Sequence, residues 1–294
     1  MLHTIENDFL RVCVCERGAE LCSVVGKKSG AEYLWQGDPA FWSGRATVLF
    51  PICGRLFGGA YTYRGRRYEM PIHGIAKSAV FRVGQKSGNR VALVFCSDEQ
   101  TRRAYPFDFR FRVVYALDGA TLSQRFFVEN TGGDVLPFSL GGHPGFFVPF
   151  PGARGESFGD YRLEFAGARK TRAIRLSDDG FYIDEQDFSL RDGRVLDLRH
   201  DLFDRDALFL SGAGNSVRLC SQKNGRAITV RFSDMTHLGF WHTPRTEAPF
   251  VCVEPWHGTP SRDGKIDDFS EKSEMIRLPA GETYTTEISI SIEE

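Results

Sequence analysis

The chain has 294 residues, of which 41% are hydrophobic and 26% are charged. This composition provides enough apolar material to bury a core and excludes a disordered chain. The 37 Lys and Arg residues nearly balance the 38 Asp and Glu residues, and a formal net charge of -1 gives no field that attracts polyanions. We therefore expect neither nucleic acid nor an anionic membrane surface as a partner.

Composition also indicates the fold class. Aromatic residues make up 13% of the chain, 25 residues are Phe and 31 are Gly, and strands favour aromatic side chains. No segment is rich in Ala, Leu, Glu and Lys, the residues that packed helices prefer. The sequence therefore predicts a mostly β structure.

The cysteines and the N-terminal residues bear on the compartment. The seven cysteines are an odd number and include no C-x-x-C pair, so we expect buried, reduced thiols. The N-terminal residues lack a basic start followed by an apolar stretch, and no apolar run approaches the ~20 residues of a membrane span. These features predict a cytoplasmic protein with no membrane partner.

The first predicted elements are two strands and one short helical turn. Alternating apolar residues predict strands at residues 9–15 and 90–96. Ser97 is a favourable helix N-cap, and Gln100 lies three residues further on, which predicts a helical turn. Pro106 prevents a long continuation, so we expect this turn to be a connector.

The clearest structural signal is a β-hairpin that begins near residue 107. Over residues 107–117 the odd positions are large and apolar, and the early even positions are charged, which predicts a half-buried strand. Asp118-Gly119 tolerates the positive φ of a tight turn. Side chains then alternate from Leu122 to Val128, which predicts the return strand.

The remaining pattern predicts further strands and one domain. The alternation predicts strands at residues 227–232 and 284–292, and we expect the even-numbered residues of the latter strand to point inward. Residues 151–157 read as a surface loop, and no linker, low-complexity tract or fixed-period repeat is present. We expect residues 1–294 to form a single domain. At this length, so many strands favour an all-β fold, a large antiparallel β-sandwich, over a small barrel.

Three segments interrupt the alternating pattern with ionisable residues among glycines, prolines and aromatic residues. The first has two parts, residues 51–57 and 71–77; the second covers residues 137–147, and the third covers residues 250–258. These segments contain the candidate functional residues.

Glu254 and His143 are the most informative candidates. Glu254 follows an apolar run that predicts a buried strand, where an ionised carboxylate must be paired, hydrogen-bonded or facing a cleft. His143 lies between Gly142 and Pro144 and precedes two phenylalanines. Structural roles remain open for both: a glutamate that binds backbone or an arginine, and a core histidine that bonds a carbonyl.

A metal site is not expected from the spacing of the ligand-type residues. The residues that such a site would recruit are His73, His143, His242, His257 and Glu254. Zinc sites usually include a close pair such as H-x-x-x-H on one element, and no such pair is present. We therefore expect no metal.

Short motifs along the chain together resemble one known family. They are Gly54-Arg55-Leu56-Phe57, residues 71–77 (PIHGIAK), Tyr105-Pro106-Phe107, residues 137–144 (PFSLGGHP), residues 204–208 (DRDAL) and residues 252–256 (CVEPW). In this order and spacing they resemble the aldose 1-epimerase (galactose mutarotase-like) family, and in particular its bacterial LacX-like branch. The resemblance covers nearly the whole chain.

The resemblance implies a fold, an activity and a set of site residues. The family has a large antiparallel β-sandwich and interconverts the α and β anomers of aldoses or their phosphates without a cofactor. Carried over to this chain, Glu254 resembles the general base and His143 the general acid. Arg55 and His73 resemble residues that orient the sugar. Asp206 resembles the carboxylate that holds sugar hydroxyls, and Asp204 is a near neighbour.

Two further expectations concern the sugar and the pH dependence. Trp241, Trp256 and Phe146 are candidates to stack on the C–H face of a sugar ring. An ionised Glu254 would take the O1 proton, and a protonated His143 would donate to the ring oxygen O5. Such a pair predicts a bell-shaped pH dependence, with an acidic limb from the carboxylate and a basic limb from the imidazolium.

Two positions depart from the family pattern, and other activities remain open. Relatives often have Asn in place of Gly54 and Arg in place of Lys77, which bears on the sugar that is bound. A hexose-6-phosphate epimerase would gather arginines on one rim of the site, and the candidates are Arg55, Arg66, Arg67 and Arg103. A carbohydrate-binding module would need no acid and base, whereas a glycoside hydrolase usually needs two carboxylates. The expected partner in each case is a small-molecule sugar.

Overall fold

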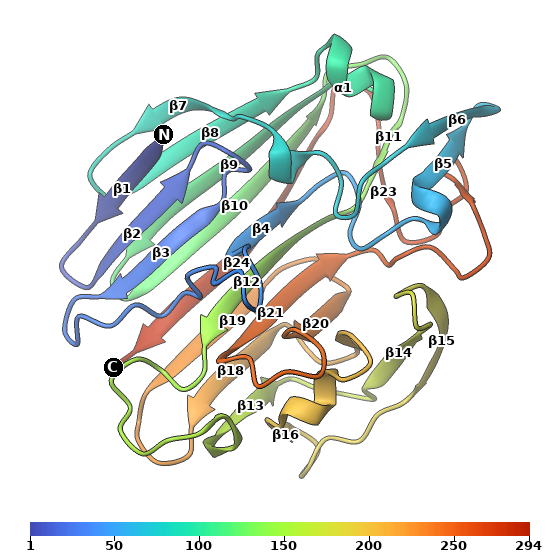
Figure 1. Cartoon of the computed structure of the whole chain (residues 1–294). Helices are drawn as coiled ribbons and strands as arrows, with labels where there is room; N and C mark the ends of the chain where they lie inside the picture. The colour runs from blue at the N-terminus through green and yellow to red at the C-terminus, as the bar shows by residue number, and fades with distance from the viewer.

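The computed structural model describes residues 1–294, and its secondary structure is almost entirely β (Figure 1). The one α-helix is α1 (Glu99–Ala104), and the 3-10 helices are η1 (Phe57–Gly59), η2 (Ala76–Ser78), η3 (Phe158–Asp160) and η4 (His200–Phe203). No helix is long and apolar enough to span a membrane. The predicted all-β class is confirmed.

The larger of the two main sheets has nine antiparallel strands. In spatial order they are β16 (Val195–Asp197), β13 (Tyr161–Ala166), β18 (Ser216–Ser221), β19 (Ala227–Phe232), β24 (Thr283–Glu293), β10 (Thr121–Asn130), β9 (Phe109–Asp118), β8 (Arg90–Cys96) and β7 (Arg82–Lys86). The last strand of the chain, β24, pairs with β10 on one side and β19 on the other. The sheet is therefore complete only when the C-terminal residues are in place.

The second main sheet has seven strands, and three small sheets accompany it. Its spatial order is β15 (Tyr182–Asp187), β14 (Arg172–Leu176), β17 (Leu208–Ser211), β20 (His237–Trp241), β21 (Phe250–His257), β12 (Leu140–Phe147) and β4 (Ala46–Leu49). The small sheets are β1 (Leu2–Glu6), β2 (Leu10–Cys15) and β3 (Leu21–Gly26); β22 (Asp267–Asp268), β5 (Ala60–Tyr63) and β6 (Arg66–Glu69); and β11 (Leu136–Phe138) with β23 (Ile276–Leu278).

The two main sheets pack face to face around one core. A cluster of 65 buried hydrophobic residues includes side chains from both sheets. Phe165 of β13 meets Phe240 of β20 edge to face, with 5.7 Å between the ring centroids. A Cβ on Gly142 of β12 would lie only 2.7 Å from Cδ1 of Ile288 on β24, so glycine allows this close approach. The predicted β-sandwich is confirmed.

The strands predicted from alternation are present. β9 and β10 form the predicted hairpin, and Gly119 in its turn has a φ of +54°. The odd positions of β9 from Phe109 to Leu117 are buried. β2, β8, β19 and β24 occupy the other predicted ranges, and residues 151–157 form a loop. Period-two patterns therefore identified strands of both the main and the small sheets.

The predicted cap of the short helix was wrong. Asp98, rather than Ser97, caps α1: its side chain accepts a hydrogen bond from the Thr101 backbone N–H at 2.7 Å, and the Asp98 N–H donates to Thr101 Oγ1 at 2.8 Å. The Ser97 hydroxyl instead donates to Asp108 and accepts from the Phe109 N–H. Ser97 is thus occupied by contacts at the start of β9.

The cysteines are unpaired, as predicted, but they are not all buried. Cys53, Cys220 and Cys252 are buried, whereas Cys96 is exposed and the other three are partly exposed. Cys96 is the last residue of β8, and neighbouring side chains do not cover it there. The prediction of buried thiols therefore holds for three of the seven positions.

Candidate active site

The candidate site lies on the outer face of the seven-stranded sheet. Along β21, Val251 and Val253 join the core between the sheets, so Cys252 and Glu254 point to the opposite face. Loops cover this outer face as well, and Glu254 is only 1% exposed. This arrangement explains why β21 is buried along almost its whole length although it carries a carboxylate.

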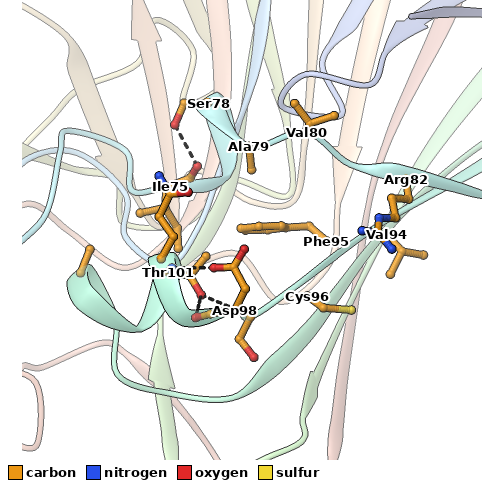
Figure 2. Close-up of a pocket in the computed structure, with 13 residues that line it drawn as sticks. Ile75, Ser78, Ala79, Val80, Arg82, Val94, Phe95, Cys96, Asp98 and Thr101 are labelled. Atoms are coloured by element: carbon orange, nitrogen blue, oxygen red, sulfur yellow. Dashed lines mark hydrogen bonds between the residues drawn. The ribbon is translucent and has the colours of Figure 1, made fainter.

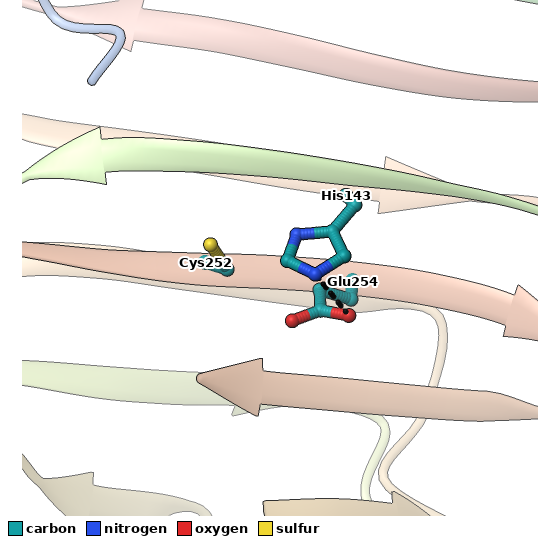
Figure 3. A group of neighbouring side chains, drawn as sticks. All are labelled: His143, Cys252 and Glu254. Atoms are coloured by element: carbon teal, nitrogen blue, oxygen red, sulfur yellow. Dashed lines mark ion pairs between the residues drawn. The ribbon is translucent and has the colours of Figure 1, made fainter. Parts of the chain in front are cut away.

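His143 and Glu254 face each other across two paired strands. β12 and β21 are antiparallel, with Gly141 opposite Trp256 and Gly145 opposite Cys252. The same register, continued between these pairs, places His143 opposite Glu254. Nε2 of His143 lies 3.3 Å from Oε2 of Glu254 (Figure 3). Strand pairing therefore holds together two residues that are 111 positions apart in the chain, by subtraction of their numbers.

Burial determines where the proton of this pair resides. Desolvation raises the pKa of Glu254 well above its usual value, and the charge of Asp206 adds to this effect. Desolvation lowers the pKa of His143 to about 3, and the charge of Lys77 acts in the same direction. Both shifts favour the neutral form. The pair therefore holds one proton, and Glu254 rather than His143 carries it.

This protonation order is the reverse of the one expected from the sequence, in which Glu254 is ionised and His143 is protonated. The physical reason is that both groups are desolvated and that the neighbouring charge of Lys77 or Asp206 has the same sign as the charge each group would carry. His143 Nδ1 and Glu254 Oε1 are buried and make no hydrogen bond within the protein. A neutral pair costs less than two buried charges in such a place.

A pocket of about 310 Å³ opens beside the pair. This volume lies at the lower end of the range of small-molecule sites, roughly 300–1,000 Å³. The six residues predicted for catalysis or sugar binding all line it: Arg55, His73, His143, Asp206, Trp241 and Glu254. Lys77, Trp42 and Trp256 line it too. The structure thus brings together residues from all three of the unusual sequence segments.

His73 presents a fixed hydrogen-bond donor to the pocket. Its Nδ1 accepts a hydrogen bond from the Gly54 backbone N–H at 3.2 Å. Burial lowers the pKa of His73 well below its usual value, and the charges of Lys77 and Arg55 act in the same direction. The ring is therefore neutral and carries its hydrogen on Nε2, so it can donate to a bound oxygen.

Arg55 and Asp206 flank Gly180 at another wall of the pocket. Nη1 of Arg55 donates to the backbone oxygen of Asp179 at 2.8 Å. A Cβ on Gly180 would lie 3.1 Å from Oδ2 of Asp206 and 3.2 Å from Cζ of Arg55, so both side chains reach this point. Asp206 has a φ of +92°, which is rare for a residue other than glycine. Asp204 does not line the pocket, and its charge acts on His242 instead.

Aromatic rings support His143 from two sides. Trp42 stacks on the imidazole with 4.9 Å between the ring centroids, and Trp241 meets it edge to face at 5.8 Å. Trp42 was not predicted. Its nearest sequence signal is the aromatic pair Phe41-Trp42 ahead of Gly44. Phe146, which was predicted to contact the sugar, is instead fully buried and does not line the pocket.

Two pocket walls are tied together behind the site. His242 donates from Nδ1 to the Thr243 carbonyl at 2.9 Å, so its Nε2 accepts from Nδ1 of His200 at 3.0 Å. His200 begins η4, and the Phe203 ring at the end of η4 also packs on His242. We call the His200–His242 hydrogen bond the histidine clasp. It joins the residue after Trp241 to the segment that leads to Asp206.

The loop that carries His73 depends on Gly74, and we expect Gly74→Ala to destabilise the protein by about 2–6 kcal/mol. Gly74 has a φ of +77°, and an added Cβ would overlap the carbonyl of Phe50. Gly30→Ala is the matched control, because Gly30 has a φ of +72° but no atom within 4 Å of the added Cβ. Denaturant unfolding of both variants measures the difference, and equal losses would contradict a steric role for Gly74.

Comparison with known proteins agrees with this arrangement. Residues 1–291 match the family model described as aldose 1-epimerase. The plasmid-encoded protein LacX of Lactococcus lactis subsp. lactis is 32% identical over 301 residues, and the match covers 98% of each chain. The chain belongs to the aldose 1-epimerase family. The predicted family and its LacX-like branch are confirmed.

Solved structures of related proteins show the same fold. A galactose mutarotase related enzyme from Lactobacillus acidophilus superposes with a TM-score of 0.93 at 33% identity, with 100% of this chain and 98% of that chain covered. A galactose mutarotase-like protein from Lactobacillus casei also gives 0.93, at 31% identity with both chains fully covered. A putative aldose 1-epimerase from Escherichia coli K12 gives 0.79 at 17% identity, over 100% and 99% of the chains, and shows the fold alone.

The two departures from the aldose 1-epimerase pattern both lie in the pocket wall. Gly54 has a φ of +71°, and a Cβ there would lie 2.7 Å from Cγ of Pro260, so a larger residue at this position would be strained. Lys77 lies on η2 and forms no ion pair, and burial lowers its pKa. Arg55 likewise has no carboxylate partner at ion-pair distance. The other candidates for a phosphate-binding rim, Arg66, Arg67 and Arg103, do not line the pocket.

A second, larger cavity of about 690 Å³ lies elsewhere on this family member (Figure 2). It is bounded by η2 and β7 on one side and by β8 and α1 on the other, and Phe95 lies in its wall. Its one carboxylate, Asp98, is occupied as the cap of α1. Because it lacks a histidine and a free carboxylate, we assign the chemistry to the smaller pocket.

Proposed function

We propose that this protein is an aldose 1-epimerase that interconverts the α and β anomers of an aldose by general acid and base catalysis. Family membership implies a sugar substrate. The observation that carries the finer proposal is the 3.3 Å contact between His143 Nε2 and Glu254 Oε2 at the wall of a hexose-sized pocket. An acid and a base that share one proton are what the opening of a cyclic hemiacetal requires.

The reaction follows from the position of these two groups. In the ring-opening step, Glu254 takes the proton of O1 and His143 gives a proton to O5 as the C1–O5 bond breaks and a carbonyl forms at C1. After rotation about the C1–C2 bond, the same steps run backwards on the other face. O1 and O5 are both bonded to C1, so two catalytic atoms that lie 3.3 Å apart suit two adjacent sugar oxygens.

The neutral pair is converted to the reactive form by one internal proton transfer. Glu254 holds the shared proton and His143 Nε2 lies 3.3 Å away, so transfer between them gives a carboxylate and an imidazolium without exchange with solvent. Sugar hydroxyls that donate to the unpartnered Glu254 Oε1 stabilise the carboxylate. Substrate binding therefore favours the ionised pair that the chemistry uses.

The other pocket residues hold the sugar in the roles expected of them. The Nε2–H of His73 and the guanidinium of Arg55 donate to sugar oxygens, and the carboxylate of Asp206 accepts from hydroxyls. The Trp241 ring supplies an aromatic surface for the C–H face of the ring. Because donors and acceptors fix the sugar in one orientation, O1 and O5 are presented to the catalytic pair.

A hexose 6-phosphate is the second candidate substrate. Arg55 and Lys77 are two cations of the pocket wall that have no carboxylate partner at ion-pair distance, and a phosphate would supply one. Glycoside hydrolysis has less support, because the catalytic pair is a carboxyl and an imidazole rather than two carboxyls.

Exchange spectroscopy by NMR tests the proposal. The rates at which α and β anomers interchange are measured for a panel of aldoses and their 6-phosphates, with and without the protein. We expect acceleration for at least one sugar, and comparison of each sugar with its 6-phosphate separates the two substrate classes. Sugar binding without any acceleration would identify a carbohydrate-binding module and contradict the proposal.

The pH dependence of the reaction follows from the shifted pKa values, and we expect a broad plateau across neutral pH. The pair is active while it holds one proton. On the acid side it gains a second proton only near pH 3, where His143 titrates. On the alkaline side it loses its proton only far above the usual carboxyl range, because the pKa of Glu254 is raised.

The measurement is kcat/KM against pH in a buffer that contains a chelator, after subtraction of the uncatalysed rate. The plateau replaces the narrower bell expected from the sequence, since burial moves the two limbs apart. A fall centred at 6.5, the ordinary value for histidine, would show that His143 titrates as an exposed group and would contradict the buried pair.

A further inference from the structure

Cys252 is a buried thiol that the proposed reaction does not use. It lies on β21 two residues before Glu254 and therefore on the same face of the strand. It is fully buried, and burial raises the pKa of its thiol well above the usual value, so it is not a nucleophile. Its sulfur nevertheless lies beside the catalytic pair of His143 and Glu254.

Three different ligand types meet at this point (Figure 3). The sulfur of Cys252, a ring nitrogen of His143 and a carboxyl oxygen of Glu254 all lie within 4.8 Å of one another. All three residues are buried. His143 Nδ1 and Glu254 Oε1 have no hydrogen-bond partner, so atoms on both residues are free to be reoriented toward a ligand.

We infer that Cys252, His143 and Glu254 form a binding site for a divalent cation of the zinc type, which replaces the protons of these groups and blocks the catalytic pair. The site is neutral before and after the exchange. The thiol and the shared pair each release one proton, and the thiolate and carboxylate together balance the two charges of the ion. A buried site accepts such an exchange more readily than it accepts a net charge.

The donor set selects the class of ion. Thiolate with imidazole and carboxylate suits Zn²⁺, Co²⁺ and Cd²⁺, whereas Mg²⁺ and Ca²⁺ prefer oxygen alone. Tetrahedral coordination at bond lengths of ~2.0 and ~2.3 Å places ligand atoms about 3.5 Å apart. The His143 to Glu254 distance of 3.3 Å already matches, so the Cys252 sulfur is the atom that must approach.

The cation site predicts inhibition in which metal and sugar compete. His143 and Glu254 line the pocket, so the fourth position of a bound ion is open to water or to the sugar. A metal on these two groups removes both the acid and the base. The metal site is inferred from the positions of its ligand atoms, and only its inhibitory effect rests on the proposed 1-epimerase activity.

Titration with Co²⁺ tests the site, because a tetrahedral cobalt–thiolate complex has visible and near-ultraviolet absorption bands. We expect one Co²⁺ per chain with a thiolate-to-cobalt band in the wild-type protein and loss of that band in Cys252→Ser. Cys252→Ala is the second variant if the buried hydroxyl impairs folding. Cys53→Ser is the matched control, since Cys53 is an equally buried thiol near Glu254 and should leave the band unchanged.

Activity supplies a separate readout. We expect Zn²⁺ to abolish anomerisation, a chelator to restore it, and Cys252→Ser to be about tenfold or more less sensitive while keeping its metal-free rate. Mg²⁺ should have no effect. Absence of the absorption band, or an equal band in wild type and Cys252→Ser, would overturn the metal site even if the protein anomerises sugars. The expected cobalt–thiolate band in a protein that does not accelerate anomer exchange would instead contradict the proposed function alone.

Discussion

Replacing Glu254 with glutamine should lower the anomerisation rate by about 10²–10⁴-fold, the usual contribution of a positioned general base. Glutamine has nearly the same shape as glutamate, so the pocket is preserved. It cannot take the proton of O1, and without that transfer the hemiacetal does not open. Exchange rates at saturating sugar measure the loss.

The stability of Glu254→Gln separates a chemical role from a structural one. The pKa of Glu254 in the folded protein lies above its usual value of 4.5, so wild-type stability falls as the pH rises from there toward the folded pKa. Glutamine does not titrate. We therefore expect the variant to have an equal midpoint of thermal unfolding at low pH and a higher one at high pH.

A matched control is available for the loss of a buried carboxylate. Asp267 is 5% exposed, accepts a hydrogen bond from Ser261 and pairs with Lys272 at 3.1 Å outside the pocket. Asp267→Asn should reduce stability and leave kcat unchanged. Near wild-type turnover in Glu254→Gln would remove this residue from the mechanism.

The second large effect is expected at His143. His143→Asn removes the proton donor to O5, and the rate should again fall by about 10²–10⁴-fold. The asparagine side chain is shorter and does not reach Glu254, so the effect on the pH profile is diagnostic: the plateau should lose its limb near pH 3, which belongs to His143. Kinetic measurements across pH test both expectations.

The control for His143→Asn is another buried histidine. His237 is 3% exposed, lies on β20 and contacts Thr236 rather than the pocket. His237→Asn should affect stability without a comparable loss of turnover. If the two variants lose turnover equally, His143 has only a structural role.

Local pattern was sufficient for part of the fold. The β9–β10 hairpin was predictable because its information is contained in some twenty consecutive residues: alternation, a two-residue turn and alternation again. The order of strands in the two sheets was not predictable in this way. β24 pairs with strands that are more than fifty residues away, and no local pattern in residues 283–293 specifies those partners.

The site was predictable as far as it depends on unusual residues in linear segments. Glu254 and His143 stood out because ionisable groups are costly to bury in apolar surroundings, and the family resemblance supplied their roles and those of their neighbours. Trp42 and Cys252 did not stand out, since aromatic and thiol side chains are ordinary in a core. Their relation to His143 exists only after β4, β12 and β21 have paired and the loop before β4 has folded over them.

The protonation order of the pair was beyond sequence reasoning. The choice between Asp204 and Asp206, which are two residues apart, was also beyond it: only Asp206 lines the pocket, and its φ there is +92°. Likewise, the pKa directions of Glu254 and His143 depend on the extent of desolvation, which is a property of the packed loops.

The histidine clasp links two sides of the pocket. Trp241 is bonded to one partner of the clasp, and Asp206 follows the 3-10 helix that begins with the other, where its N–H donates to the Phe203 carbonyl. The aromatic surface and the carboxylate are therefore linked through one side-chain hydrogen bond and one ring contact. The rates of amide hydrogen exchange at Phe203 and at Trp241 should fall to a similar extent when a sugar occupies the pocket. Binding at one end of the clasp would then also increase protection at the other end.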